Sequence, residues 1–254
     1  LSSITFTATS NLTSIGNYAF KNCNSLQSIR IPSSITTVGT TPFSGCSGLT
    51  NVLVQSVNIV FSTVFTGSIS ITTVTFDYNG VIPPNACKDR TALSRVVIGN
   101  QITSTGSNAF NSCSNLSSII FTSTSNLSSI GTSAFKNCVL LETFDIPDTV
   151  TTIGTSAFDG MSILTSITIL NNLSVLNEGI FANCVNLSSV ITTNATINQI
   201  KNGAFYNCSN LTTLTIPNSV AKINSYAFIN TTLSIVDFET SSQLTIIGNY
   251  VFKN

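Results

Sequence analysis

The chain has 254 residues, of which 42% are hydrophobic and only 7% are charged, and its nine basic residues balance nine acidic ones. This balance gives no electrostatic footprint for nucleic acid or for an anionic membrane surface. No apolar stretch reaches the roughly 20 residues of a membrane-spanning helix, and no charged-then-apolar signal segment opens the sequence, which begins at Leu1. We therefore expect a processed chain or a segment of a longer protein.

A repeat of about 23 residues dominates the sequence. Its clearest mark is the pentapeptide AFKNC, which occurs at 19–23 and again at 134–138. An anchor residue equivalent to the phenylalanine of this pentapeptide recurs eleven times at intervals of 22 to 25 residues. The anchors are Phe20, Phe43, Phe65, Cys87, Phe110, Phe135, Phe158, Phe181, Phe205, Phe228 and Phe252. Such regular self-similarity is typical of a solenoid, in which stacked coils share one core.

Strands are predicted by a second periodic feature, the phrase L-x-x-I-x-I. Its alternating end places two side chains inward and one outward, which indicates a short β-strand. In chain order the phrases occupy 1–6, 26–31, 49–54, 71–76, 93–98, 116–121, 141–146, 164–169, 187–192 and 211–216. We expect one strand per coil, paired in parallel with the strand of the next coil about 4.8 Å away.

Turns are predicted between the strands. Glycine stands four residues before six of the anchors, where we expect a positive φ or a close backbone approach. These glycines are Gly16, Gly39, Gly106, Gly131, Gly154 and Gly248. Pro32, Pro147 and Pro217 follow strand phrases and mark where pairing stops. We expect the A-F-x-x-C stretch to form a tight bend or a single 3₁₀ turn on the convex side.

The position five residues before each anchor is apolar in all coils but one. Examples are Ile15, Val60 and Ile82, and the exception is Thr105. The pattern is least regular between 57 and 100. There Phe61 and Pro83 replace the glycine, and Cys87 replaces the anchor phenylalanine.

The full unit, L-x-x-I-x-I-P-x-x-V/I-T-x-I-G-x-x-A-F-x-x-C, is clearest at 141–158 and 211–228. It resembles the BspA-like leucine-rich repeat along essentially the whole chain. The resemblance implies a β-rich repeat solenoid, a single domain over 1–254. We expect an arc or horseshoe of about eleven 23-residue coils, with a parallel concave β-sheet and short turns or 3₁₀ segments on the convex side. Neither end carries a polar cap, so we expect the protein to extend further, and bare coil edges would permit homo-association.

Cysteine chemistry is the first candidate function. Six of the seven cysteines lie three residues after an anchor. We interpret them as small buried side chains, one per coil. Three pairs in neighbouring coils lie within disulfide distance, but their parallel Cβ directions disfavour bonding. These six are Cys23, Cys46, Cys113, Cys138, Cys184 and Cys208.

Catalysis and metal binding are the next candidates. The chain contains no histidine, so it has no Ser-His or Cys-His pair and no Cys-His zinc motif. Glu142, Asp145 and Asp148 come close together in sequence and could in principle make an acid pair, but we interpret them as solvated surface. We expect a protein that is not an enzyme and that uses no metal or cofactor.

The last candidate function is a binding surface. The outward-facing residue of each strand, ten positions after the anchor, varies in type from coil to coil, whereas the inward-facing residues are regularly apolar. We expect this row, with Arg95 beside it, to form the binding face. Its members are Arg30, Leu53, Thr75, Val97, Ile120, Asp145, Thr168, Ile191 and Thr215. Apolar residues with a polar rim are typical of a protein-binding patch. The alternative is that β-branched residues simply favour strands.

The resemblance also implies a function. BspA-like proteins are typically surface or secreted proteins of anaerobic bacteria and of mucosal protists that attach to host cells and matrix proteins. We therefore expect an adhesin ectodomain that recognises a host or matrix protein. One alternative is a structural or self-associating coat protein. Another is an ice-binding solenoid with Thr-x-Thr rows, but Arg30, Arg95 and Asp145 interrupt these rows.

Overall fold

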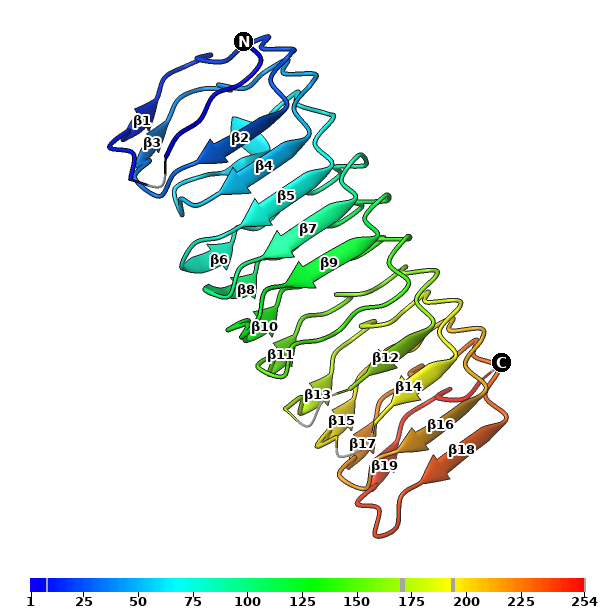
Figure 1. Ribbon diagram of the computed structural model, residues 1–254. Helices are drawn as coiled ribbons and strands as arrows, with labels where there is room; N and C mark the ends of the chain where they lie inside the picture. The colour runs from blue at the N-terminus through cyan, green and yellow to red at the C-terminus, as the bar shows by residue number, and fades with distance from the viewer. Residues whose placement is uncertain (8, 170–171, 193–194, 254) are drawn as a thin grey trace. The chain divides into compact units, whose positions relative to one another are not determined.

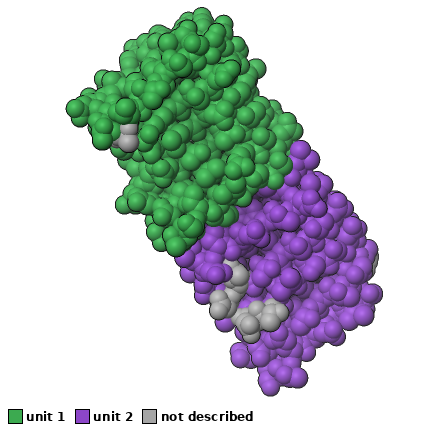
Figure 2. All heavy atoms as spheres, in the orientation of Figure 1, with its two compact units in different colours: residues 1–126 green, residues 127–254 purple. Residues whose placement is uncertain are grey.

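The computed structural model describes residues 1–7, 9–169, 172–192 and 195–253. The chain divides into two compact units, Leu1–Asn126 (unit 1) and Leu127–Asn254 (unit 2) (Figures 1 and 2). In each unit the chain forms a parallel β-solenoid, in which paired strands are 22 to 24 residues apart in sequence. The predicted solenoid of roughly 23-residue coils is therefore confirmed.

Five strands form one parallel sheet in unit 1 (Figure 1). Each lies at the end of a predicted L-x-x-I-x-I phrase, and inward side chains such as Ile29, Val52 and Val74 are buried. Neighbouring strands are aligned so that equivalent repeat positions pair. In order across the sheet they are β2 (Ser28–Ile31), β4 (Asn51–Val54), β5 (Thr73–Phe76), β7 (Arg95–Ile98) and β9 (Ser118–Phe121).

A second set of short strands lies elsewhere on the coils. In unit 1, β1 (Ser14–Ile15) pairs with β3 (Thr37–Val38), and β6 (Gly80–Ile82) pairs with β8 (Ile102–Thr105). These strands contain the residue five before the anchor, which is apolar except at Thr105 and is buried in most coils. The expectation of one strand per coil is therefore wrong. Strands of two residues escape detection because they are too short to show an alternation.

Unit 2 repeats this arrangement of two strand sets. Its first set consists of two pairs, β12 (Ser166–Thr168) with β14 (Ser189–Ile191) and β16 (Thr213–Ile216) with β18 (Ile235–Phe238). In its second set β10 (Ser129–Ile130) pairs with β11 (Thr152–Ile153). Four further strands of this set pair in sequence order, namely β13 (Val175–Leu176), β15 (Gln199–Ile200), β17 (Lys222–Ile223) and β19 (Ile246–Ile247).

Two predicted strand phrases, 1–6 and 141–146, contain no strand. In the second phrase Phe144 and Ile146 are nonetheless buried as predicted. A backbone hydrogen bond from the nitrogen of Thr165 to the oxygen of Glu142, 3.3 Å long, joins this segment to the next coil. The apolar pattern therefore determines which side chains enter the core, but it does not guarantee a regular ladder.

The irregular region contains an unpredicted helical turn, α1 (Phe61–Val64). Ile59 and Phe61 are buried on either side of Val60, which is 53% exposed. The prediction that Val60 belongs to the inward column is therefore wrong. The helical turn rotates the chain so that the neighbours of Val60 enter the core instead.

The anchor phenylalanines form stacked columns. In unit 2 the rings of Phe135, Phe158, Phe181, Phe205, Phe228 and Phe252 follow one another at centroid distances of 5.2 to 6.1 Å. In unit 1 the rings of Phe20, Phe43 and Phe65 stack at 5.0 Å. The column is interrupted at Cys87, where Phe61 and Phe76 lie between Phe65 and Phe110.

The A-F-x-x-C stretches form successive tight turns, as predicted. In the first coil the nitrogen of Cys23 donates to the oxygen of Phe20 at 3.1 Å, and the nitrogen of Leu26 donates to the oxygen of Cys23 at 3.0 Å. Residues two before and two after an anchor repeatedly have a positive φ, as Asn108 and Ser112 do beside Phe110. The described residues contain no 3₁₀ segment.

The glycines four residues before the anchors meet only one of the two expectations, which are a positive φ and a close backbone approach. The prediction of a positive φ is wrong, since Gly16, Gly39 and Gly154 do not have one. The alternative, close backbone approach, is confirmed at Gly39 and Gly154 but not at Gly16, where a Cβ would meet no atom within 4 Å. A Cβ on Gly39 would lie 2.5 Å from the nitrogen of Asn17, and one on Gly154 would lie 2.4 Å from the nitrogen of Thr132. Glycine lets neighbouring coils touch at this corner.

Candidate functional site

The predicted outward row is assembled in unit 1. The strand register aligns Arg30, Leu53, Thr75, Val97 and Ile120 across all five strands of the sheet. We call these five residues the strand row. A parallel row two residues earlier includes Asn51, Thr73 and Arg95, in the same register. Side chains that are 90 residues apart in sequence therefore share one face.

The strand row is less exposed than predicted. Leu53, Val97 and Ile120 are half-buried. Close pairing of strands explains this, because each outward side chain is covered on both sides by the equivalent side chains of the neighbouring coils. The row is therefore a shallow, partly apolar strip, with Arg30 at one end and exposed Arg95 beside it.

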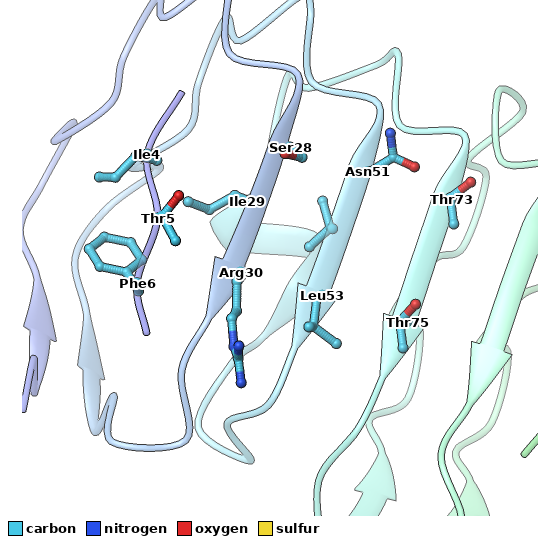
Figure 3. Close-up of a pocket in the computed structure, with 11 residues that line it drawn as sticks. Ile4, Thr5, Phe6, Ser28, Ile29, Arg30, Asn51, Leu53, Thr73 and Thr75 are labelled. Carbon is cyan, nitrogen blue, oxygen red and sulfur yellow. The ribbon is translucent and has the colours of Figure 1, made fainter. Parts of the chain in front are cut away.

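A groove lies at the Arg30 end of the strand row. It has a volume of about 340 Å³. One wall is formed by Ile4, Thr5 and Phe6, which lie alongside β2 (Figure 3). The opposite wall comes from the strands and includes Arg30, Asn51, Leu53, Thr73 and Thr75, whose side chains stand on the sheet face (Figure 3). The groove contains both apolar and hydrogen-bonding groups.

A chain of side-chain hydrogen bonds continues from this groove along the ends of the strands. The Nε of Arg30 donates to the Oε1 of Gln55 at 2.7 Å. The Nε2 of Gln55 donates in turn to the Oδ2 of Asp77 at 2.9 Å. Three successive coils are thus joined by polar groups at the surface.

The predicted site residues of unit 2 are less closely grouped. Thr168 pairs with Ile191, and Thr215 pairs with Asp237. Asp145 is exposed and belongs to no strand. A hollow of about 350 Å³ lies over Ser189, Thr213, Thr215, Ile235 and Asp237. Glu142 and Asp148 are also exposed, which agrees with their interpretation as solvated surface.

The cysteine column is a hydrogen-bonding column. The thiols of Cys46, Cys113, Cys184 and Cys208 each contact a backbone oxygen of the preceding coil at 3.0 to 3.2 Å. Ser68 makes the equivalent bond at 2.7 Å. All seven cysteines are free, and all except Cys23 are buried.

Burial determines the protonation state of these thiols. It raises the pKa of Cys113 and of Cys208 to about 12, because the charged thiolate is poorly solvated. Burial also raises the pKa of Cys184 well above its usual value. Thiols that remain protonated at neutral pH serve as donors and not as nucleophiles.

Arg90 takes the place of the thiol where the aromatic column is interrupted. It stands three residues after Cys87. Its Nη1 and Nη2 donate to the backbone oxygens of Ser68 and Phe65, both at 3.0 Å. Its guanidinium lies 4.8 Å from the centre of the Phe61 ring. Burial lowers its pKa, but arginine keeps its charge under physiological conditions.

Sequence reasoning missed two parts of this surface. One is the groove wall at Ile4 and Phe6, because 1–6 was expected to form a regular strand beside β2. The other is the pair Gln55 and Asp77. They stand directly after their strands, where Pro32 and Pro217 stand in other coils. This change from proline to hydrogen-bonding residues is visible in the sequence and could have indicated a polar site at the ends of these strands.

Residues 1–7, 9–169, 172–192 and 195–253 contain no group of three or more potential metal ligands of the His, Cys, Asp or Glu type. Within the same ranges no helix has the length and apolar character needed to cross a membrane.

Comparisons with known proteins place the repeat in a family. The family model described as "BspA type Leucine rich repeat region (6 copies)" matches residues 1–116, 52–158, 80–195 and 128–254. A search of curated proteins finds no match.

A solved structure shows the same fold. A leucine-rich repeat protein from Bacteroides ovatus is 21% identical, with a TM-score of 0.53, and the match covers 96% of this chain and 81% of that one. A leucine-rich cell surface protein from Faecalibacterium prausnitzii is 22% identical, with a TM-score of 0.45, and the match covers 94% and 86% of the two chains. Because the family matches together span the whole sequence, the chain belongs to the BspA-type leucine-rich repeat family.

Proposed function

We propose that this chain is the binding scaffold of a cell-surface or secreted adhesin, and that the strand row of unit 1 docks a host or extracellular matrix protein. The single observation that carries the proposal is the register of the sheet. It brings Leu53, Val97 and Ile120 into one strip, with Arg30 and Arg95 at its margin. An apolar centre with a charged rim has the composition of a protein interface.

The geometry suits a protein partner better than a substrate. The strip crosses five strands, so it offers an extended surface of the kind that solenoids use for partners. Its side chains are aliphatic, hydroxyl or guanidinium groups and include no general base. This chemistry supports a non-catalytic binding role.

Surface plasmon resonance against a panel of matrix and epithelial proteins tests the proposal. The variants Val97→Asp and Ile120→Asp place charges in the apolar strip, and we expect each to weaken the best partner by at least about tenfold. Thr168→Asp on β12 and Thr215→Asp on β16 also introduce a charge on an outward strand position, but in unit 2, and serve as controls. Binding that is retained by the unit 1 variants and lost in the controls would contradict this placement.

Self-association is a second candidate function, favoured by one observation. Ile235, Phe238, Ile246 and Ile247 of unit 2 are 42 to 53% exposed. Two of them, Phe238 and Ile247, pair with residues of the preceding coil that are fully buried, Ile216 and Ile223. Apolar side chains grouped on β18 and β19 favour contact with another protein surface. Sedimentation velocity should then show concentration-dependent oligomers that Phe238→Ser and Ile246→Ser abolish. A monomer at all concentrations would exclude this role.

A further inference from the structure

A polar pocket lies beyond the strand row, where the strands of unit 1 end. Its volume is about 460 Å³. Gln55 and Asp77 follow directly after β4 and β5 and line it together with Arg30, Val57, Asn79 and Gln101. We call it the strand-exit pocket. Its volume lies within the range of about 300 to 1,000 Å³ that is usual for small-molecule sites.

The hydrogen-bond chain fixes the orientation of the groups in this pocket. Gln55 accepts from Arg30 through Oε1 and donates to Asp77 through Nε2. The opposite orientation of the amide would place its oxygen against the carboxylate and its NH₂ against the guanidinium, so only one orientation satisfies both neighbours. Arg30 and Asp77 are therefore held in place before any ligand arrives.

Several groups in the pocket retain hydrogen-bonding capacity. Within the part of the chain that the structure describes, the Nη groups of Arg30 and the Oδ1 of Asp77 have no hydrogen-bond partner. The side-chain amides of Asn79 and Gln101 likewise have none there, and both residues are exposed. The pocket thus presents donors and acceptors side by side, with more than two of each.

The backbone keeps the carboxylate accessible. A Cβ on Gly99 would lie 3.0 Å from the Oδ1 of Asp77 and 2.9 Å from the oxygen of Phe76. Glycine at this position therefore leaves open the side of the carboxylate that Gln55 does not use. On the other side Val57 is 57% exposed and supplies an apolar surface next to the polar groups.

We propose that the strand-exit pocket binds a neutral saccharide. Each hydroxyl of a sugar is both a donor and an acceptor, so adjacent hydroxyls match the mixture of carboxylate, guanidinium and amide groups found here. One arginine and one aspartate give the pocket no net charge, which favours a neutral ligand over a sialylated or sulfated one. The C–H face of a sugar ring would pack on Val57. This ligand class goes beyond the protein partner proposed for the strand row.

An oligosaccharide array tests this proposal with the full chain. Each oligosaccharide is printed in a neutral form and in a sialylated or sulfated form. We expect binding to at least one neutral oligosaccharide and weaker binding to its acidic form. The best neutral oligosaccharide, free in solution, should also displace the chain from a glycoprotein that carries it. Absence of neutral binders, preference for the acidic forms or failure of this competition would overturn the proposal.

Matched variants then locate the site. Asp77→Ala should weaken binding of the best neutral oligosaccharide about tenfold, because it removes a charged hydrogen-bond acceptor. Gln55→Ala should have a similar effect, because it releases Arg30 and Asp77 from the positions that Gln55 fixes. Asp237→Asn removes an exposed carboxylate in unit 2 and should leave the affinity unchanged. If Asp77→Ala retains full affinity, the pocket is not the site. Thermal unfolding of each variant shows whether it is folded. A variant that loses saccharide binding but still binds the protein partner would show that the saccharide site is separate from the protein-docking site on the strand row.

Discussion

The aromatic columns of the two units differ in one coil, and the difference shows what the repeat requires. In unit 2 six phenylalanine rings follow one another without interruption. In unit 1 the small side chain of Cys87 occupies an anchor position and is completely buried. Other rings lie at the interruption, since the ring centroids of Phe61 and Phe65 are 4.6 Å apart and those of Phe76 and Phe110 are 6.1 Å apart.

The coil at Cys87 shows that the core requires volume and not a particular residue. The helical turn α1 brings Phe61 inward, and Arg90 covers its ring while it binds the same kind of backbone oxygens that thiols bind elsewhere. Phe61 and Arg90 together thus compensate for one missing ring. Close packing explains the coupling, since a space of this size costs several kcal/mol if it stays empty.

The largest effect is expected where no compensation exists. Phe181→Ala in unit 2 should lower the free energy of unfolding by about 3–5 kcal/mol, because it removes a fully buried ring from between two stacked neighbours. Cys87→Ala is the matched change in unit 1 and should cost about 1 kcal/mol. Urea unfolding measures both. Equal losses would show that the two columns are equally adaptable and would remove the contrast between them.

Restoring the missing ring should be harmful unless the compensating ring is also removed. Cys87→Phe should destabilise the chain by about 1–3 kcal/mol, because Phe61 and Arg90 already fill the space around this position. In the double variant Phe61→Ala/Cys87→Phe the loss should be smaller than the sum of the two single losses by at least about 1 kcal/mol. Additive losses in a double-mutant cycle would show that Phe61 does not substitute for the anchor.

The same region marks the limit of prediction from sequence. The 23-residue period identifies the coils, the main strands and the burial of Phe144 and Ile146, because these follow from which side chains are apolar. It misses the second strand set, where β1 and β3 have only two residues each. It also places Val60 in the core, because a helical turn shifts the register without changing the apolar pattern.

The candidate site was predictable to a similar degree. The strand row follows from counting ten residues after each anchor, and the register confirms that arrangement for Arg30 through Ile120. The exposed fraction of these side chains cannot be predicted by such counting, since it depends on side chains in neighbouring coils. The strand-exit pocket depends on hydrogen bonds between residues 22 and 25 positions apart, which no local motif encodes.

The glycine corner allows a comparison within unit 1 with a smaller expected effect. Gly39→Ala should cost about 1–3 kcal/mol, because its Cβ would overlap the backbone of Asn17. Gly16→Ala occupies the same repeat position, but its Cβ would meet no atom within 4 Å, so its effect should stay within about 0.5 kcal/mol. Thermal unfolding compares the two. A neutral Gly39→Ala would show that the coils can move apart at this corner.

The smallest effect concerns the thiol column and is visible only at high pH. Burial raises the pKa of Cys208 to about 12 from an ordinary value of 9.0, so the unfolded chain loses this proton at a lower pH than the folded chain. Its contribution to stability is therefore complete below pH 9 and decreases by about 1.4 kcal/mol per pH unit as the pH rises from about 9 to 12.

Cys208→Ser retains a hydrogen-bond donor, as Ser68 does naturally, but cannot ionise in this range. Urea unfolding at pH 8 should thus give similar stabilities for the two proteins, and at pH 10 the variant should have lost about 1 kcal/mol less than the parent chain. Parallel pH profiles would mean that this thiol ionises equally in the folded and unfolded chains, and would contradict its role as a protonated donor inside the solenoid.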